Sequence, residues 1–301
     1  MSEGKGNSKV LIYGLVIIIA VFWGFSFLAT SILVDYLEPI QVQAARWIVA
    51  AAFYGAMIAM GKIRIDLSKK GRWLLLACGL SQPCFYMIFE TYGIKMTSAS
   101  VGSIFVATIP CGVLLINTLV FKQKTGRNGI ISILLAFAGV AVATMCSPAF
   151  SFDGRAIGYI VMFGAVVMGA VYTVISARAG HDYSSLEVTA SMAIIGCIFF
   201  NILNFAMGYG TDTYKTVVGD PRIAGGVIFL GICCSAICYL AFNKTITMMD
   251  PALANNMNSS MTTVIGALAG IFIAGDPGGL YTVVGLAMTI AGVILSSKEI
   301  G

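Results

Sequence analysis

Residues 10–34 read VLIYGLVIIIAVFWGFSFLATSILV, a long run without a charged side chain. A helix rises about 1.5 Å per residue, so about 20 apolar residues cross the hydrocarbon core of a bilayer. The run is too long for the core of a signal peptide, and no small-residue cleavage site follows it. It therefore predicts a retained first transmembrane helix, preceded by a polar tail at residues 1–9.

Further apolar runs of similar length follow and leave no room for a soluble domain. The chain of 301 residues is 58% hydrophobic and only 10% charged, and its mean hydropathy is +0.93. A soluble domain needs more polar residues to cover its surface. Runs this long satisfy their backbone in lipid as helices. The sequence therefore predicts an all-α integral membrane protein with spans at 10–34, 40–60, 73–93, 99–121, 129–146, 156–177, 186–207, 224–248, 252–274 and 280–297.

Basic residues in the connecting segments indicate the orientation of these spans. With a cytoplasmic N-terminus, the inside segments hold twelve basic residues: Lys5, Lys9, Lys62, Arg64, Lys69, Lys70, Arg72, Lys122, Lys124, Arg127, Arg178 and Lys298. The outside segments hold four: Lys95, Arg155, Lys215 and Arg222. We therefore expect both termini in the cytoplasm. The net charge of +5 reports this topology and does not indicate nucleic-acid binding.

The two halves of the chain are related by an internal repeat. A shift of 153 residues places 86–145 on 239–298 without a gap and with nine identities. These include the pairs Tyr86–Tyr239, Phe89–Phe242 and Gly139–Gly292. The matched apolar runs and turns carry more weight than the identities, because so biased a composition produces some identities by chance. Further upstream the register is looser, with Gly24 opposite Gly169.

Five predicted spans in each half, an odd number, mean that the second half enters the membrane from the opposite side. Inverted repeats of this kind are a transporter architecture, in which the substrate sits near the midplane and is exposed alternately to each side. The predicted divisions are a cytoplasmic tail at 1–9, a first five-helix repeat at 10–147, a linker at 148–155, a second five-helix repeat at 156–297 and a cytoplasmic tail at 298–301.

Short patterns in the first four spans match those of a known family. They are Trp23-Gly24, Pro39 followed by Arg46, and FETYGIKMTSAS at 89–100 running to Pro110. In these patterns the chain resembles the drug/metabolite transporter superfamily, specifically its EamA-type ten-helix members. The resemblance implies a bacterial plasma-membrane protein in which spans one to four and six to nine line a central cavity, with spans five and ten peripheral. The family often carries Glu after the fourth span; here Gln123 occupies that position and Asp276 its repeat mate.

Polar residues inside spans are candidate substrate contacts, because they are costly in lipid. The third span carries a stripe at intervals of four residues, and the eighth span carries its repeat mates: Gln82, Tyr86 and Glu90, and Ser235, Tyr239 and Asn243. Residues four apart lie close together on one helix face. Two equivalent stripes from opposite halves suit a cavity astride a pseudo-twofold axis, so we expect them to line it. The alternative is that each stripe only hydrogen-bonds helix to helix.

The ninth span begins with seven polar residues in nine: Asn255, Asn256, Asn258, Ser259, Ser260, Thr262 and Thr263. Helical periodicity places Asn255, Asn258, Ser259 and Thr262 on one face, which we expect to contact substrate. Close packing by small residues is the alternative. The repeat mate of this segment, 102–110, is far less polar, which predicts that the substrate is held asymmetrically. Aromatic residues such as Trp23 and Tyr172 are better explained by packing or interfacial anchoring.

Arg46 and Glu90 are opposite charges predicted at similar depth in the membrane. With a rise of about 1.5 Å per residue, Arg46 lies roughly 6 Å and Glu90 roughly 10 Å outside the midplane. The other basic residue within a span, Lys244, lies near the inner end of the eighth span. We therefore predict that Arg46 pairs with Glu90. The pair would be either a static strut or an outer gate that opens when an amino-bearing substrate displaces Arg46.

These observations predict a secondary active transporter of a small organic metabolite, an amino acid or related compound, with export as the favoured direction. A proton or a counter-substrate is the candidate coupling partner. The sequence has no G-x-x-x-x-G-K-[ST] loop, so ATP is not expected to drive it directly. The alternative within transport is an uptake carrier for a vitamin-like or nitrogenous compound. An intramembrane enzyme lacks motif support, and a channel would favour symmetric pore-lining rings.

No cofactor or metal site is expected from the eight cysteines and the single histidine. The cysteines lie in or beside apolar runs without metal-ligand spacing, which is typical of small buried apolar residues. The expected partners are therefore a small-molecule substrate and the lipid bilayer, and the expected assembly is a monomer or a homodimer.

Overall fold

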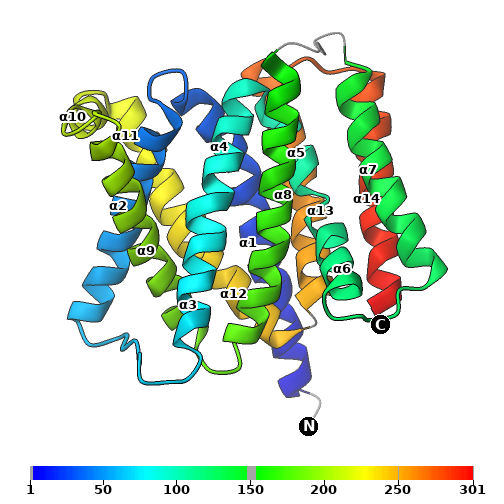
Figure 1. The fold of residues 1–301 in the computed structure, drawn as a ribbon, viewed down its shortest axis with the longest axis horizontal. Coiled ribbons are helices and arrows are strands. Elements are labelled where there is room, and N and C mark those ends of the chain that lie inside the picture. The colour runs from blue at the N-terminus through cyan, green and yellow to red at the C-terminus, as the bar shows by residue number, and fades with distance from the viewer. Residues whose placement is uncertain (1–2, 148–153, 250, 301) are drawn as a thin grey trace.

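The computed structural model describes residues 3–147, 154–249 and 251–300, which form a bundle of helices (Figure 1). Within these residues, nine helical segments are long and apolar enough to cross a membrane: Leu11–Leu33, Pro39–Ala59, Arg72–Met96, Ala99–Leu119, Arg127–Met145, Ala156–Ala179, Ser185–Ala206, Pro221–Met248 and Leu253–Ala274. Each coincides with a predicted span, and the largest differences are of three residues, as at 73–93 against Arg72–Met96. The tenth predicted span, 280–297, matches the shorter apolar helix Leu280–Ser296, so the count of ten spans remains a prediction.

Six of the predicted spans are single α-helices: α1 (Glu3–Leu33), α2 (Pro39–Ala59), α7 (Arg127–Met145), α8 (Gly154–Ala179), α9 (Ser185–Ala206) and α14 (Leu280–Ile300). The other four are divided. The third comprises α3 (Arg72–Gly79), η1 (Leu80–Tyr86) and α4 (Met87–Met96); the fourth α5 (Ala99–Val106) and α6 (Ile109–Leu119); the eighth α11 (Pro221–Ile228), η2 (Phe229–Ile237) and α12 (Cys238–Met248); and the ninth α13 (Pro251–Ala269) and η3 (Gly270–Ala274).

Two prolines coincide with interruptions in the first half. Helix α5 ends at Val106, four residues before Pro110, because a proline ring clashes with the carbonyl four residues earlier. Pro83 lies inside the π-helical segment η1. The 153-residue shift maps 80–84 of η1 onto 233–237 of η2, so both halves carry a π-helical segment at equivalent positions. Such segments are frequent at functional sites.

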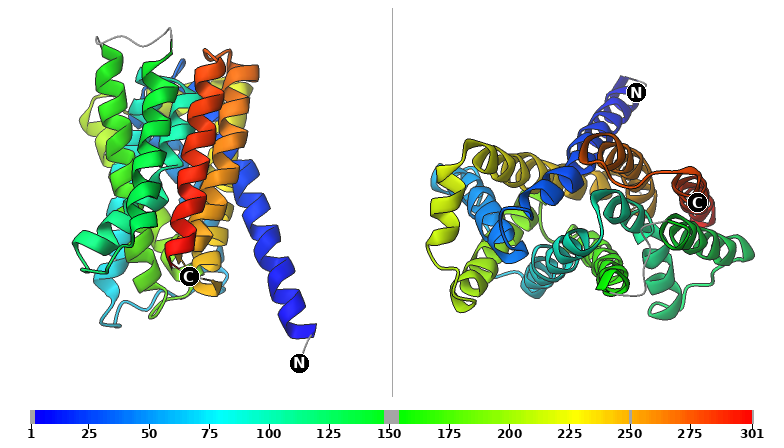
Figure 2. Two further views of the ribbon diagram at one scale, coloured as in Figure 1. Left: turned by 90° about the vertical axis from the view of Figure 1, so that its right-hand side faces the viewer. Right: turned by 90° about the horizontal axis from the view of Figure 1, so that it is seen from above.

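Helix α1 begins and helix α14 ends at the same end of the bundle in Figure 1, as the predicted even number of crossings requires. The connection between α2 and α3 lies at this end too, whereas the short helix α10 (Asp212–Gly219) lies at the opposite end. We call the first the terminal end and the second the distal end. The sequence predicts no helix in the α10 segment, which lies between the spans 186–207 and 224–248. Figure 2 shows the first turns of α1 leaning away from the bundle at the terminal end.

Helices α7 and α14 stand side by side at one edge of the bundle (Figure 1). A Cβ atom on Gly139 would lie 2.6 Å from the carbonyl oxygen of Gly285, and one on Gly292 would lie 2.7 Å from that of Ser132. The 153-residue shift converts Gly139 into Gly292 and Ser132 into Gly285, so the two contacts are equivalent. Backbones approach this closely in membranes only where side chains are small.

The outer surface of the bundle is apolar. Large side chains such as Ile160 and Phe272 are 71% and 80% exposed. A soluble protein rarely exposes many such side chains together, but lipid is as apolar as they are. The exterior is therefore suited to the bilayer, and polar side chains are found mainly inside and at the two ends.

Candidate functional site

A cavity inside the bundle is lined by both halves of the chain. Residues of α1, α2, η1, α4, α5 and α6 from the first half and of α8, α12 and α13 from the second form its wall. The cavity has a volume of about 50 Å³. Helices α7 and α14 contribute no described lining residue, in line with their peripheral place. Neither does α9, although the family resemblance implies that its span would contribute.

Eight of the eleven site residues proposed from the sequence line this cavity: Arg46, Gln82, Tyr86, Glu90, Tyr239, Asn255, Ser259 and Thr262. They come from four predicted spans, the second, third, eighth and ninth. The tertiary structure therefore brings together residues of both predicted polar stripes and of the polar face of α13.

The three remaining residues are buried but do not line the cavity. The Oγ atom of Ser235 accepts a hydrogen bond of 2.7 Å from Arg46 Nε. Asn243 Oδ1 accepts hydrogen bonds from the hydroxyls of Tyr172 and Ser176, both at 2.7 Å, so its amide serves helix packing. Asn258 Nδ2 donates to the carbonyl of Ala254 in its own helix, at 2.9 Å. The expectation that these three form the cavity wall is corrected accordingly.

Arg46 and Glu90 do not form the predicted ion pair in this structure. Both side chains are buried and line the cavity, but no nitrogen–oxygen distance between them is within 4.0 Å. Each has a nearer partner. The guanidinium donates to Ser235 from η2, and Glu90 Oε1 accepts a hydrogen bond of 2.8 Å from the Tyr86 hydroxyl one turn earlier. Depth in the membrane predicts the pair, but these nearer partners depend on how the helices pack.

Aromatic rings form much of the remaining wall. The ring of Trp23 lies 5.1 Å from that of Tyr239 and 5.5 Å from that of Phe242, centroid to centroid. Tyr172 stacks on Phe242 at 6.2 Å. The Trp23 Nε1–H donates to the carbonyl of Cys234 at 3.0 Å, which fixes the indole. Aromatic pairs at such distances add about 0.5–1.5 kcal/mol beyond the area they bury.

Trp23 and Tyr172, for which packing or interfacial anchoring is the expectation from the sequence, both line the cavity, as does Phe242. One signal was available. Trp23 precedes Gly24, and a Cβ on Gly24 would lie 2.5 Å from Ile265 Cγ2 of α13. In the second half, a Cβ on Gly169 would lie 2.7 Å from Ile109 Cδ1 of α6. These looser repeat mates therefore mark close contacts of α1 with α13 and of α8 with α6.

Two lining atoms are buried polar groups without a hydrogen-bond partner among the described residues: Gln82 Oε1 and Thr262 Oγ1. The other end of the Gln82 amide donates to the Tyr239 hydroxyl at 2.6 Å, which joins the two stripes. An unpaired buried acceptor or hydroxyl costs about 1–3 kcal/mol. These atoms, one from each half, are therefore available to a bound molecule.

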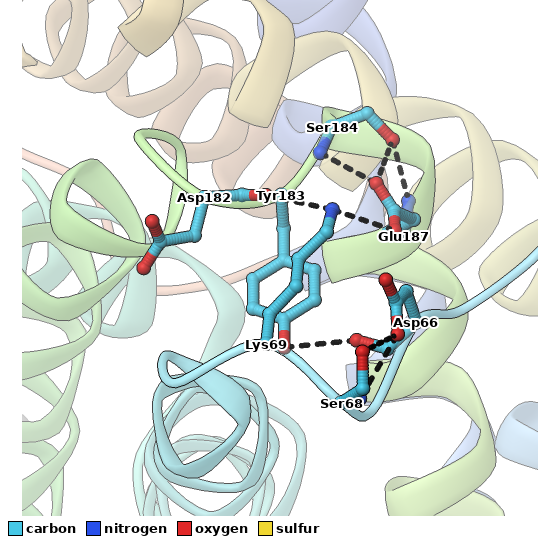
Figure 3. A network of polar contacts seen from close by, with 7 residues as sticks. All are labelled: Asp66, Ser68, Lys69, Asp182, Tyr183, Ser184 and Glu187. Atoms are coloured by element: carbon cyan, nitrogen blue, oxygen red, sulfur yellow. Dashed lines mark hydrogen bonds and ion pairs between the residues drawn. The ribbon is translucent and has the colours of Figure 1, made fainter.

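At the terminal end, a polar network joins the connections α2–α3 and α8–α9 (Figure 3). Lys69 Nζ lies 3.5 Å from Glu187 Oε1 and donates to the carbonyl of Asp182 at 2.9 Å. The Tyr183 hydroxyl donates to the carbonyl of Asp66 at 3.1 Å. Hydrogen bonds from the side chain and the backbone N–H of Ser68 lower the pKa of Asp66. The network thus ties the first half of the chain to the second on this face.

A bundle of membrane-spanning helices around a cavity built by both halves is the architecture of a membrane transport protein. Comparison with known proteins agrees. The sequence model of the EamA-like transporter family matches residues 10–145 and 156–298, nearly the whole chain. The chain therefore belongs to the EamA-like transporter family, and the resemblance to EamA-type drug/metabolite transporters is confirmed.

Similar proteins occur in distant organisms. An "Uncharacterized transporter" of Archaeoglobus fulgidus is 24% identical over 282 residues, which cover 92% of this chain and 95% of that protein. "Uncharacterized transporter YcxC" of Bacillus subtilis is 22% identical, with 91% of this chain and 88% of that protein covered. A solved structure titled "Crystal structure of protein" superimposes with a TM-score of 0.69 and 14% identity, covering 97% of this chain and 98% of that one. The last comparison concerns the fold alone.

Proposed function

We propose that this protein is a secondary active transporter that moves a small organic metabolite, an amino acid or related compound, by alternating access. The observation that carries the proposal is the central cavity, which is lined by both halves and holds buried groups of either charge. Charged residues inside a membrane bundle are costly and mark substrate or ion pathways. Membership of a transporter family favours transport over intramembrane catalysis.

The proposed mechanism depends on two inverted halves, 10–147 and 156–297, joined by a linker at 148–155. The equivalent contacts of Gly139 and Gly292, and the π-helical segments at equivalent positions, support this division. Rocking of the halves around the cavity would expose it first to one side and then to the other. We place the protein in a bacterial plasma membrane with both termini cytoplasmic, as a monomer or a homodimer.

Counterflow in proteoliposomes tests the transport proposal. Vesicles preloaded with an unlabelled metabolite should accumulate the labelled compound above its equilibrium level, because a carrier exchanges substrate through one saturable site. Empty vesicles and vesicles holding a heat-denatured sample are the controls. Uptake that rises linearly with concentration, without acceleration by preloading, would indicate a channel instead.

Export is the proposed direction, and uptake of a vitamin-like or nitrogenous compound is the alternative. A proton or a counter-substrate is the proposed driving partner. Imposing a pH gradient on the same vesicles distinguishes the two partners. A proton-coupled carrier would concentrate substrate in response to the gradient alone, whereas an exchanger would need substrate on both sides.

A further inference from the structure

Two side chains of opposite charge line the central cavity without forming a direct ion pair. Arg46 is 2% exposed and Glu90 is 6% exposed. Both line the cavity, yet their charged atoms are not within 4.0 Å of each other. A buried charge is costly unless it is paired and hydrogen-bonded. The cavity therefore offers one cationic and one anionic group that a ligand could complement.

Both groups also have unused hydrogen-bonding capacity. A guanidinium carries five N–H donors, of which Arg46 directs one to Ser235 Oγ and one to the sulfur of Met87 at 3.5 Å. Thioether sulfur is a weak acceptor, so this second contact yields readily to a better one. A carboxylate accepts at about four lone-pair sites, and the one described donor to Glu90 is the Tyr86 hydroxyl.

Aromatic rings and uncharged polar side chains share the cavity wall with these two charges. Trp23, Tyr239 and Phe242 form a cluster of rings, and Gln82 Oε1 and Thr262 Oγ1 are unpaired. A suitable ligand thus combines a negative group, a positive group and an apolar body. A guanidinium favours a carboxylate, which it can bind through two parallel hydrogen bonds.

We propose that the cavity selects zwitterions, with Arg46 binding the carboxylate and Glu90 the ammonium group of one substrate whose apolar part lies against the aromatic rings. This inference rests on the proposed transport function and assigns its charge selectivity to two residues. A ligand with a single charge leaves the other buried charge uncompensated. Selection therefore works by a penalty on the wrong ligand as well as by attraction to the right one.

Binding of three related probes to the purified protein tests the assignment. The probes are phenylalanine, its methyl ester, which is only cationic, and N-acetylphenylalanine, which is only anionic. Thermal stabilisation reports their affinity, because a ligand of the folded state raises apparent stability. We expect phenylalanine to bind at least tenfold more tightly than either derivative.

Two variants should change this ranking in opposite ways. In Glu90→Gln, phenylalanine should lose its advantage over the N-acetyl compound, because the ammonium has no countercharge. In Arg46→Gln, it should lose its advantage over the methyl ester. Lys244→Gln is the matched control. Lys244 is the other basic residue within a predicted span, and it lines a separate groove on the surface of the bundle. It should leave all three affinities unchanged.

If Arg46→Gln does not fold, Arg46→Lys replaces it. This variant keeps the positive charge but loses the two parallel hydrogen bonds of a guanidinium. It should keep the ranking of the three probes while binding phenylalanine more weakly. The proposal is wrong if wild-type protein binds either derivative as tightly as phenylalanine, if it binds none of the three, or if Glu90→Gln keeps the wild-type ranking. The transport proposal is judged separately. Saturable counterflow of a compound with one charge or none would keep transport and reject zwitterion selection.

Discussion

Lys69 and Glu187 form an ion pair of 3.5 Å between the connection α2–α3 and the first turn of α9. Lys69 also lies over the ring of Tyr183, 4.7 Å from its centroid (Figure 3). The pair joins the two halves on the terminal end of the bundle. In alternating access, contacts of this kind must separate when the cavity opens to that side. A partly exposed pair contributes about 0–1 kcal/mol, so it can bias the two states up to roughly fivefold.

Removing this pair should favour the conformation that is open at the terminal end. Val106 lines the cavity, so a cysteine introduced there (Val106→Cys) reports access from the terminal end. In this background, we expect Lys69→Met and Glu187→Gln each to raise the rate of cysteine alkylation about two- to fivefold, because the closing contact is weakened. The rate of labelling by an impermeant maleimide is measured in inside-out vesicles. The rate for the parent chain, which lacks Val106→Cys, is subtracted. Lys215→Met removes an exposed pair within α10 at the distal end and should leave the rate unchanged. A wild-type rate in both test variants would show that the network does not control opening.

The close approach of α7 and α14 predicts intolerance of any side chain at Gly139 and Gly292. Adding a methyl group there brings Cβ to 2.6 Å or 2.7 Å from a carbonyl oxygen, so the helices must separate. Overpacking of this kind costs about 1–3 kcal/mol. Thermal unfolding in detergent should show the loss for Gly139→Ala and Gly292→Ala. Gly14→Ala is the control, because a Cβ there has no atom within 4 Å among those described. Equal unfolding temperatures for all three variants would contradict the described interface.

Adjacent residues of α13 should differ in their effect on transport. Ser259 lines the cavity, so Ser259→Val should reduce transport of the cognate substrate several-fold while expression stays normal. Asn258 bonds within its own helix, so Asn258→Ala should keep transport and lose about 1 kcal/mol of stability at most. Initial rates in proteoliposomes measure the difference. Equal rates for Ser259→Val and wild type would assign the polarity of this face to packing alone.

The predicted orientation can be tested by labelling introduced cysteines in intact cells. A cysteine in 212–222, which includes α10 at the distal end (Figure 1), should react with an impermeant reagent. A cysteine in 64–70, at the terminal end, should react only after the cells are opened. The parent chain corrects for native cysteines, of which Cys146 is exposed. The reverse pattern would place both termini outside and remove the basis of the proposed topology.

The sequence by itself determined the membrane-spanning segments, because a bilayer imposes a length and an apolarity that can be read locally. It also indicated the repeat. Eight of the eleven proposed site residues line one cavity in the structure. Helical periodicity was enough for Gln82, Tyr86 and Glu90, since residues of one helix face share a neighbourhood. Nothing in the local pattern distinguished Asn258 from Ser259, because adjacent residues of one polar segment differ only in which neighbouring helix they meet.

Only the tertiary structure decided which side chains form hydrogen bonds with each other. The depth of Arg46 and Glu90 predicted an ion pair, but Ser235 in η2 and Tyr86 one turn away provide closer partners. Hydrogen bonding depends on angle and distance at the scale of a single ångström, whereas span boundaries carry errors of several residues. The burial of Trp23 against Tyr239 likewise depends on the approach of α1 to α12. The bilayer determines which segments are helices, and the packing between helices determines which polar and aromatic side chains meet.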